Sequence, residues 1–504
     1  MFKIFQGFHL VEAYQKKKKE RRLSDDKTVS RIIRLLIPIF VSLVVWLMPT
    51  ESFGIEGLTL VEQRVMAVFV FATLMWVLEA IPAWTTSVAV VTILLLTASD
   101  SSLWLFREGI PVEELGKTIK YSSLMHCFAD PIIMLFIGGF MLAIAATKTG
   151  MDAVLAKVML KPFGTQSKYV LLGFLVVTGV FSMFLSNTAT AAMMLTFLAP
   201  VLKALPADGK GKIALALAIP ISPNVGGMGT PIGTPPNAIA LKFLNDPEGL
   251  NMNIGFGEWM AFMIPFTIVM LFLAWLLLLK MFPFKQKTIQ LEIKGEAKKD
   301  WRSIIVYITF AVTILLWMTD KVTGVNANVV AMVPVAVFCL IGVITKRDLE
   351  EISWSVLWMV AGGFALGVAL QESGLGKHLV ASIPFDTWSP VLVIVGSGLI
   401  CYTMANFISH TATAALLVPI LGTAGTAMTA QLAPLGGVAT LLIGVAIGSS
   451  LAMVLPISTP PNALAHGTGL IKQKDMEVVG LIVGVAGLIL GYSMLVFLGS
   501  SGLI

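Results

Sequence analysis

The sequence predicts an all-α polytopic membrane protein built from two repeats of inverted topology. Of its 504 residues, 57% are hydrophobic and 13% are charged, about half the charged fraction of roughly 25% that is usual in soluble proteins. Apolar stretches of about 18 residues or more recur along the chain, and each is a candidate membrane-spanning helix. Three pairs of short motifs recur in the same order at nearly the same spacing. Composition therefore predicts membrane helices, and the motifs predict a duplication.

The duplication is read from motifs that combine hydroxyl, amide, glycine and proline residues. The pairs are Ser186-Asn187-Thr188 with Ser409-His410-Thr411 (409 − 186 = 223), Thr234-Pro235-Pro236-Asn237 with Thr459-Pro460-Pro461-Asn462 (459 − 234 = 225), and Gly138-Gly139-Phe140 with Gly362-Gly363-Phe364 (362 − 138 = 224). Three motifs in one order at one spacing indicate two copies of roughly 224 residues.

The chain begins with a basic segment, residues 1–30, which holds Lys16-Lys17-Lys18-Lys19-Glu20-Arg21-Arg22. Such a cluster favours the cytoplasmic side of a membrane, and it could also contact anionic lipid. A leading helix is predicted at 31–49, repeat 1 at 60–281, a cytoplasmic linker at 282–301 and repeat 2 at 302–500. The other complete crossings are predicted at 63–81, 83–99, 130–148, 258–281, 302–319, 328–345, 353–372 and 476–499, with broken helices at 212–243 and 435–470.

Residues 168–205 and 389–427 are predicted to be re-entrant hairpins. Residues 168–205 can form two helices of about 16 residues, shorter than the roughly 20 that a crossing needs. The polar junction between them, Ser186-Asn187-Thr188, is tolerated at membrane depth only where it lines a cavity or is buried in protein. The broken helices have another cause, because two successive prolines cannot lie in a helix interior.

These assignments give eleven transmembrane helices: one leading helix and five crossings in each repeat. Because five is odd, the second repeat is inverted relative to the first. Lysine-rich loops, such as 148–168 and the linker, then fall on the cytoplasmic side, which places the N-terminus inside and the C-terminus outside. We therefore expect an integral protein of the plasma or inner membrane.

Inverted repeats with broken helices are typical of secondary transporters. Two hairpins and two broken helices would bring four helix N-termini together, each worth about +0.5 of an elementary charge. Their sum, roughly +2, matches a dianion. The motifs hold no Arg or Lys, so hydroxyl, amide and backbone N–H groups would hold the substrate.

Other classes of function lack support in the sequence. The basic residues lie in short loops rather than in a nucleic-acid-binding surface, the cysteines and histidines show no metal-ligand spacing, and no catalytic motif such as His-Glu-x-x-His is present. We expect no enzymatic activity, no cofactor and no nucleic-acid partner. A packing role for small polar residues would explain one such cluster but not four duplicated ones. An ion channel is disfavoured because it would have no need of a saturable dianion site.

The motifs, together with Leu78-Glu79-Ala80-Ile81-Pro82, resemble the divalent anion/sodium symporter (DASS) family, which carries di- and tricarboxylates. The resemblance runs from about residue 60 to 500. It implies a homodimer in which each protomer has a scaffold and an elevator-type transport domain. It also implies substrate contacts from Ser186, Asn187, Thr188, Thr234, Ser409, His410, Thr411 and Thr459, and a first sodium site at Ser182, Ser186, Asn187 and the Gly233 carbonyl.

The second half departs from the family pattern. Where sodium-coupled members resemble Thr-Glu-Phe-x-Ser-Asn-Thr, this chain reads Ala405-Asn406-Phe407-Ile408-Ser409-His410-Thr411. The second sodium site is therefore predicted to be lost, at Ala405, Ile408, His410 and Ser458. His410 is either a neutral group bonded to a backbone carbonyl or an imidazolium that replaces the sodium charge.

A resident imidazolium could not leave with the substrate, and moving it uncompensated through the membrane costs on the order of 2.5–3.5 kcal/mol. On that interpretation the chain is an obligatory, sodium-independent exchanger of C4/C5 dicarboxylates such as succinate, malate, fumarate and 2-oxoglutarate. Two alternatives remain open: a sodium-coupled dicarboxylate symporter, and a proton-coupled carrier that uses His410.

Overall fold

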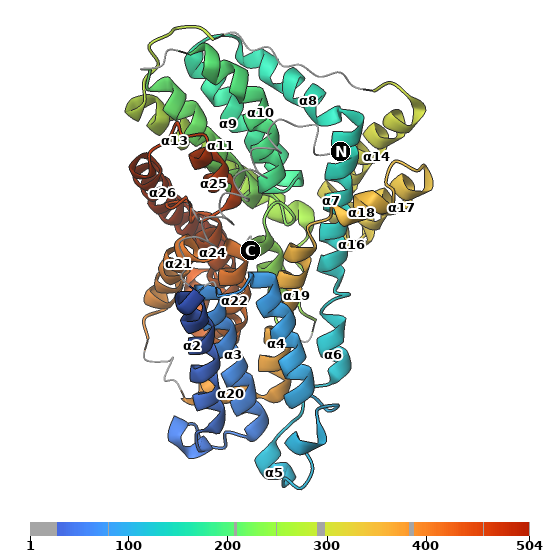
Figure 1. Cartoon of the computed structure of the whole chain (residues 1–504), viewed down its shortest axis with the longest axis vertical. Coiled ribbons are helices and arrows are strands. Elements are labelled where there is room, and N and C mark those ends of the chain that lie inside the picture. The colour runs from blue at the N-terminus through green and yellow to red at the C-terminus, as the bar shows by residue number, and fades with distance from the viewer. Residues whose placement is uncertain are drawn as a thin grey trace.

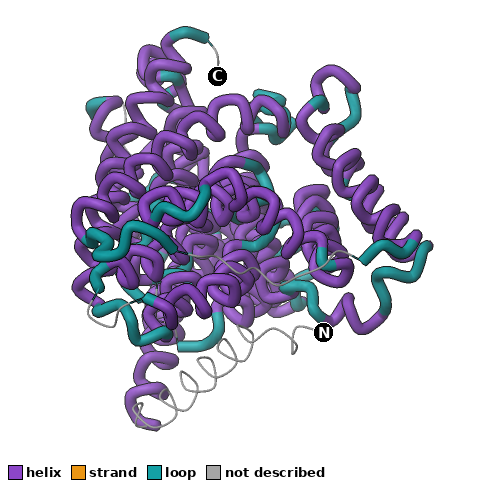
Figure 2. Tube along the Cα trace, turned by 90° about the horizontal axis from the view of Figure 1, so that it is seen from above, coloured by secondary structure: helices purple, strands orange, loops and turns teal. Residues whose placement is uncertain are grey.

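The computed structural model describes residues 28–78, 80–205, 209–247, 249–289, 298–382, 388–456 and 458–502. Within these ranges the chain is helical, with two isolated bridges, Ser99–Ile119 and Gln166–Thr288, in place of any strand (Figure 2). Figure 1 shows α2 to α4 at one end of the long axis and α9, α10 and α13 at the other. The predicted all-α architecture is confirmed. The basic cluster at Lys16–Arg22 and residue Glu79 lie outside the described residues.

The helices of repeat 1 and the segment before it are α2 (Thr28–Leu47), α3 (Leu60–Leu78), α4 (Ala83–Thr97), α5 (Val112–Leu115), α6 (Tyr121–His126), α7 (Pro131–Thr149), α8 (Met151–Leu160), α9 (Ser167–Phe184), α10 (Asn187–Ala204), α11 (Gly211–Gly226), α12 (Pro235–Leu244) and α13 (Phe256–Met281). Those of repeat 2 are α14 (Trp301–Met318), α15 (Asp320–Thr323), α16 (Ala327–Val330), α17 (Met332–Leu340), α18 (Lys346–Glu350), α19 (Trp354–Ser373), α20 (Leu375–Ser382), α21 (Pro390–Phe407), α22 (His410–Ala427), α23 (Thr429–Leu432), α24 (Gly437–Ser450), α25 (Pro460–Gly467) and α26 (Gln473–Ser500).

Eight of the described helices are long and apolar enough to cross a membrane, or up to nine if α22 and the segment after it, bent by 92°, form one span. The chain is therefore a polytopic membrane protein, but helix length does not give the predicted eleven crossings. Two predicted crossings are shorter apolar helices: Ala83–Thr97 and Ala327–Leu340. The first of these begins directly after Pro82, its N-cap residue. A helix of 15 residues is about 22 Å long, less than the roughly 30 Å of the hydrocarbon core.

Helices of the two halves begin at matching positions. α7 and α19 begin at residues 131 and 354, α9 and α21 at 167 and 390, and α10 and α22 at 187 and 410, each 223 residues apart. α12 and α25 begin at 235 and 460, which are 225 apart. Each arm of the two predicted hairpins is an 18-residue helix, slightly longer than the roughly 16 residues expected. The duplicated motifs thus coincide with duplicated helices.

The two most deeply buried helices are α11 and α24, in which almost every residue is buried. α11 packs against α9 and α10 of its own half and against α25 of the other half, whereas α24 packs against α21 and α22 of its own half and against α12 of the other. This reciprocal exchange is the pattern expected of two copies related by a two-fold axis. Close approach of α11 and α9 depends on glycine, because a Cβ on Gly226 would lie 2.3 Å from the Gly179 carbonyl oxygen.

An ion pair ties the end of α7 to the short helix α18. Lys148 Nζ lies 2.6 Å from Asp348 Oδ2, and these side chains are only 17% and 6% exposed. The same carboxylate caps α18 by accepting hydrogen bonds from the N–H and hydroxyl of Thr345. Burial would raise the pKa of the Asp348 carboxyl, but the hydrogen bonds from Lys148 and Thr345 outweigh it and hold the pKa below its ordinary value.

We expect Asp348→Asn to lower the free energy of unfolding by about 2 kcal/mol, because charge-assisted hydrogen bonds in a sheltered position are lost. Melting temperature in detergent measures the effect. Since the pKa of Asp348 is depressed in the folded state, its stabilisation is present above the ordinary carboxyl pKa, near 4, and is lost as the pH falls through the folded value. The difference between parent and variant should therefore shrink below about pH 4.

The matched control is Asp475→Asn, because Asp475 caps α26 by accepting the Lys472 N–H at 3.2 Å. It should lower the melting temperature less than Asp348→Asn does. Equal losses would show that capping, and not the pair with Lys148, is what stabilises this junction.

Candidate substrate-binding site

The tips of the two helical hairpins are built alike. Ser186 is the N-cap of α10 and accepts the Ala189 N–H at 3.2 Å, and Ser409 is the N-cap of α22 and accepts the Ala412 N–H at 3.1 Å. Serine is favoured at this position because its oxygen satisfies one of the free N–H groups of the first turn. The other N–H groups at each tip stay available, so each hairpin presents the positive end of a helix dipole.

The Thr-Pro-Pro-Asn segments start the second halves of the broken helices. Two prolines are tolerated there because the first turn of a helix has no intrahelical acceptors for its N–H groups. The asparagine fastens the preceding loop: Asn237 Nδ2 donates to the carbonyls of Gly227, Met228 and Thr230. Asn462 Nδ2 likewise donates to the carbonyls of Met453 and Leu455. Each break is therefore held in one shape by its own amide.

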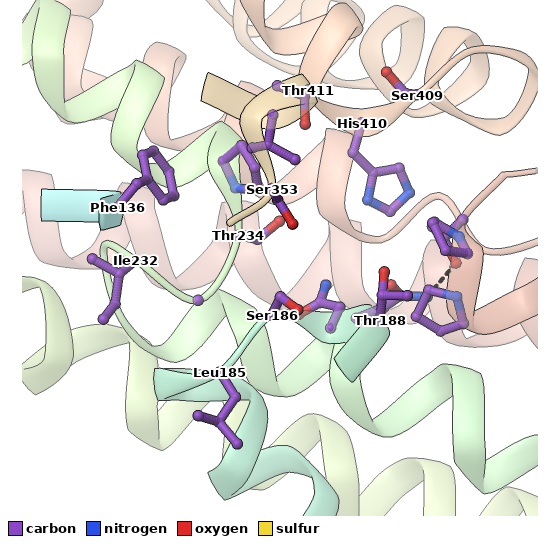
Figure 3. A pocket seen from close by; sticks show the side chains of 18 of the residues that line it. Phe136, Leu185, Ser186, Thr188, Ile232, Thr234, Ser353, Ser409, His410 and Thr411 are labelled. Carbon is purple, nitrogen blue, oxygen red and sulfur yellow. Dashed lines mark hydrogen bonds between the residues drawn. The ribbon is translucent and has the colours of Figure 1, made fainter. Parts of the chain in front are cut away.

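All four segments converge on one cavity of about 400 Å³. Figure 3 shows Ser186 and Thr188 on one side, Ser409, His410 and Thr411 on the opposite side, and Thr234 between them. The described residues that line it are hydroxyl, amide, glycine, proline and apolar residues together with His410, and none of them is Asp, Glu, Lys or Arg. The eight residues predicted to contact substrate all line this cavity: Ser186, Asn187, Thr188, Thr234, Ser409, His410, Thr411 and Thr459.

The two threonines at the breaks differ in their hydrogen bonding. The Thr459 hydroxyl donates to Asn462 Oδ1 at 2.9 Å and accepts the Asn462 N–H at 3.2 Å, whereas the Thr234 side chain makes no such cap. In this structure the Thr459 proton is therefore engaged by protein, and the Thr234 hydroxyl is the better placed of the two to donate to a bound anion.

Behind the first hairpin tip lies a group of oxygens, which we call the first oxygen group: Ser182 Oγ, Pro223 O and Gly233 O. With its nitrogen toward this group, the Asn187 amide donates to Ser182 Oγ at 2.6 Å, to Gly233 O at 3.1 Å and to Pro223 O at 3.2 Å, whereas its oxygen in the same place would face acceptors. The Ser182 hydroxyl itself has only one proton to donate. The group is therefore satisfied either by the Asn187 N–H groups or by a cation, and oxygen ligands are those that hard cations prefer. Ser186, also predicted for this cation site, instead uses its oxygen as the helix cap.

Glycines keep the space beside the first oxygen group open. A Cβ on Gly227 would lie 2.8 Å from Asn187 Oδ1 and 2.9 Å from the Gly233 carbonyl oxygen, and one on Gly233 would lie 2.3 Å from the Gly227 carbonyl oxygen. Such contacts are too close for real Cβ atoms. Only glycine can therefore stand at these two positions, and the oxygens beside them suit a small cation.

The equivalent place in repeat 2 is closed by its own hydrogen bonds. His410 stands at the position of Asn187, and its Nε2 donates to the Ala452 carbonyl at 2.6 Å. The Ser458 hydroxyl donates to the Asn406 carbonyl at 3.0 Å, and Asn406 Oδ1 accepts the Val454 N–H at 2.8 Å. Ala452 and Ser458 replace Gly227 and Gly233 (452 − 227 = 458 − 233 = 225).

The other two residues of the predicted lost site, Ala405 and Ile408, are buried and have no side-chain oxygen. The polar groups of this half thus bond to one another, whereas the first oxygen group depends on the Asn187 amide, or on a cation, for its partners.

Sequence reasoning missed Asn224, which joins the two halves of the site. From α11, its Nδ2 donates to Thr459 Oγ1 at 3.3 Å and to Asn462 Oδ1 at 3.2 Å. An amide within the buried run 212–226 was the available signal. It also missed the lining supplied by α7 and by the start of α19, namely Phe136, Gly139, Phe140, Ser353, Ser355, Val356 and Met359. For Gly139 and Phe140 the duplicated Gly-Gly-Phe motif was the available signal, whereas the others have the pattern of ordinary packing residues, so only the fold reveals them.

Residues 29–501 match the family described as "Sodium:sulfate symporter transmembrane region". Two similar proteins are each named sodium-dependent dicarboxylate transporter SdcS. The one from Staphylococcus aureus (strain USA300) is 30% identical over 464 residues, covering 84% of this chain and 84% of its own. The one from Staphylococcus saprophyticus is 28% identical over 470 residues, covering 86% and 85%.

Two solved structures share the fold. The YdaH transporter of Alcanivorax borkumensis gives a TM-score of 0.53 at 12% identity, over 86% of this chain and 98% of that one. MtrF of Neisseria gonorrhoeae, described as illuminating a class of antimetabolite efflux pumps, gives 0.52 at 12% identity, over 82% and 94%. At such identity the likeness extends to the fold alone.

We expect Gly227→Ala to prevent cation binding by the first oxygen group, because the added methyl would occupy the space beside Asn187 and Gly233. The measurement is the change in melting temperature of the purified protein between sodium chloride and choline chloride at equal ionic strength. Gly422→Ala is the matched control, since its Cβ would meet no atom closer than 3.7 Å. A sodium-induced rise of parental size in Gly227→Ala would locate the cation elsewhere.

Proposed function

The chain belongs to the sodium:sulfate symporter family, and from that membership we propose that it is a secondary transporter of C4/C5 dicarboxylates coupled to sodium. The family is one of transporters, so the chain is a transporter and not an enzyme. The substrates we propose are dianions such as succinate, malate, fumarate and 2-oxoglutarate.

The observation that carries the proposal is the cavity between the four helix starts. The described residues of its lining offer hydroxyl groups, amides and helix starts, and none of them is Asp, Glu, Lys or Arg. Two carboxylates can each be held at a hairpin tip, where the dipole of α10 or α22 favours negative charge. Binding by dipoles and neutral donors is weaker than binding by Arg or Lys, which suits a carrier that must also release its substrate. The relatives named as dicarboxylate transporters support the same substrate class.

Sodium coupling is supported by two independent observations. The similar staphylococcal proteins are named sodium-dependent transporters. The first oxygen group brings one hydroxyl and two carbonyl oxygens together beside Asn187, with Gly227 and Gly233 packed closely against them. We propose that Ser182, Asn187, Pro223 and Gly233 bind one sodium ion that crosses the membrane with the substrate.

His410 supports this reading over obligatory exchange. The exchange prediction needed a resident imidazolium, and the described residues contain no carboxylate paired with His410, which is buried and donates to a neutral carbonyl. A buried charge without a counter-charge is costly. A neutral imidazole is therefore the better interpretation, and it leaves no fixed charge to stall the empty carrier.

Exchange remains the second candidate, favoured by the altered stretch from Ala405 to Thr411, which leaves repeat 2 without the oxygens of repeat 1. A proton-coupled carrier using His410 is the third. The transport cycle we propose is an elevator movement of the two hairpins and broken helices against a scaffold, in a homodimer of inverted repeats. The N-terminus is proposed to be cytoplasmic and the C-terminus outside.

The test of coupling is uptake of labelled succinate into proteoliposomes. We expect an inward sodium gradient to drive accumulation into liposomes with no internal dicarboxylate, because the cation and the dianion cross together and the site returns empty. Replacing sodium by choline at equal ionic strength should reduce the initial rate by about tenfold or more.

The outcome that contradicts sodium symport is equally clear. Uptake that needs internal dicarboxylate and proceeds at full rate without sodium would establish the exchanger. His410→Asn distinguishes the roles of the ring: it should preserve sodium dependence if the ring is neutral, and loosen the requirement for internal dicarboxylate if the ring carries the fixed charge of an exchanger.

A further inference from the structure

The side-chain amide of Asn187 has different surroundings at its two ends. One end faces Ser182 Oγ, Pro223 O and Gly233 O, which are acceptors, and the other end is among hydrogen-bond donors. With Oδ1 toward the first oxygen group, the oxygen faces oxygens and the nitrogen faces donors. Turning the amide by 180° reverses both mismatches, since Nδ2 then donates to Ser182 Oγ at 2.6 Å, to Gly233 O at 3.1 Å and to Pro223 O at 3.2 Å.

Each orientation matches one state of ligand occupancy. With both sites empty, Nδ2 toward the first oxygen group supplies the protons that the group lacks, and Oδ1 accepts from the donors at the other end. With sodium present, Oδ1 is the better group to face it, because a cation requires an acceptor. Nδ2 is then directed to the opposite end, where a carboxylate among the same donors would accept its hydrogen bond. Asn187 lines the substrate cavity, so that end is open to such a ligand.

We propose that rotation of the Asn187 amide couples sodium binding to dicarboxylate binding, with the nitrogen filling the cation position and the oxygen filling a carboxylate position when the carrier is empty. This inference rests on the proposed function. Sodium alone leaves Nδ2 without an acceptor, and the dianion alone places Oδ1 against two carbonyl oxygens, with only the Ser182 hydroxyl to donate to it. Either ligand therefore favours the other, and by linkage the effect is the same in both directions.

Repeat 2 cannot make this movement. At the equivalent position the His410 ring donates from Nε2 to Ala452 O, and a ring has no carbonyl oxygen to offer a cation when it is turned. The coupling device is therefore confined to repeat 1. The neighbours of Asn187 divide by side: Ser182 belongs to the oxygen group, whereas Thr188 lines the cavity.

The experiment measures the dissociation constant for succinate by calorimetry on the purified full-length protein, in sodium chloride and in choline chloride at equal ionic strength. In the parent we expect sodium to tighten succinate binding by about tenfold or more. In Asn187→Ala the dissociation constants for succinate in the two salts should become similar, because both change. Binding in sodium weakens because a cation ligand and a donor are lost. Binding in choline is at least as tight as in the parent, because no Oδ1 competes for the donors.

Two neighbouring variants serve as controls. Thr188→Ala should weaken succinate binding by the same factor in both salts, so that the ratio is kept. Ser182→Ala should raise the sodium concentration that is needed to tighten succinate binding. At saturating sodium, the ratio of the dissociation constants in choline and in sodium should equal that of the parent. Melting temperature and gel-filtration profile establish that each variant is folded.

The alternative is an amide that touches both ligands without turning. It predicts that Asn187→Ala weakens succinate binding in both salts, and that result would overturn the proposal while leaving sodium-coupled transport intact. A ratio of parental size in Asn187→Ala would overturn it as well. A parent that does not bind succinate, or binds it with no effect of sodium, would instead refute the proposed function itself.

Discussion

A helix that stops inside a membrane leaves backbone N–H groups without water to bond, and the architecture of the site follows from how this chain meets that constraint. At the hairpin tips, Ser186 and Ser409 each accept one of those N–H groups. At the broken helices, prolines occupy positions that need no donor, and Asn237 and Asn462 bond the carbonyls of the preceding loops. The residues that begin these helices line the cavity. The same groups whose burial would be costly in lipid thereby become the binding surface for an anion.

The two halves keep this backbone frame and differ in the side chains around it. Gly227 and Gly233 leave space beside Asn187, while Ala452 and Ser458 fill the matching space beside His410. The hydrogen bonds differ as well, because the polar atoms of repeat 2 bond to one another, whereas two carbonyls and a hydroxyl of repeat 1 lie around the Asn187 amide. Asn224 crosses between the halves to hold Thr459 and Asn462. The two halves thus share a backbone frame and differ in the polar groups that surround it.

A feature of this arrangement could be predicted from the sequence only where it has a recognisable local pattern of residues. The helices and the motifs at their junctions could be predicted, because apolar length, polar junctions and paired prolines act locally. The lining residues of the four motifs could be predicted because they recur at one spacing. The helix predicted at 83–99 is observed at Ala83–Thr97, because Pro82 precedes it and polar residues follow it. Whether the hairpins re-enter the membrane stays a prediction. Asn224 and most of the lining residues near α7 and α19 could not be predicted as lining, because their role arises only from the packing of distant segments. Whether His410 carries a charge also depended on its surroundings, and only the structure could show that a carbonyl, rather than a carboxylate, faces it.

None of the described residues that line the cavity is Asp, Glu, Lys or Arg, and this bears on the return step of a carrier. A helix dipole favours an anion at its N-terminus, but it adds no net charge to the body that moves, because the opposite end moves with it. A site made of helix starts can therefore bind a dianion when loaded and still cross the membrane empty. A fixed imidazolium would add a full charge to the empty site, and the insertion cost of such a charge, on the order of 2.5–3.5 kcal/mol, would oppose its passage. In the proposed site, helix dipoles from both halves bind the dianion, and the cation leaves with it. The site can therefore bind a dianion strongly enough and still return empty without a net charge. In physical terms, this empty return distinguishes a symporter from an exchanger.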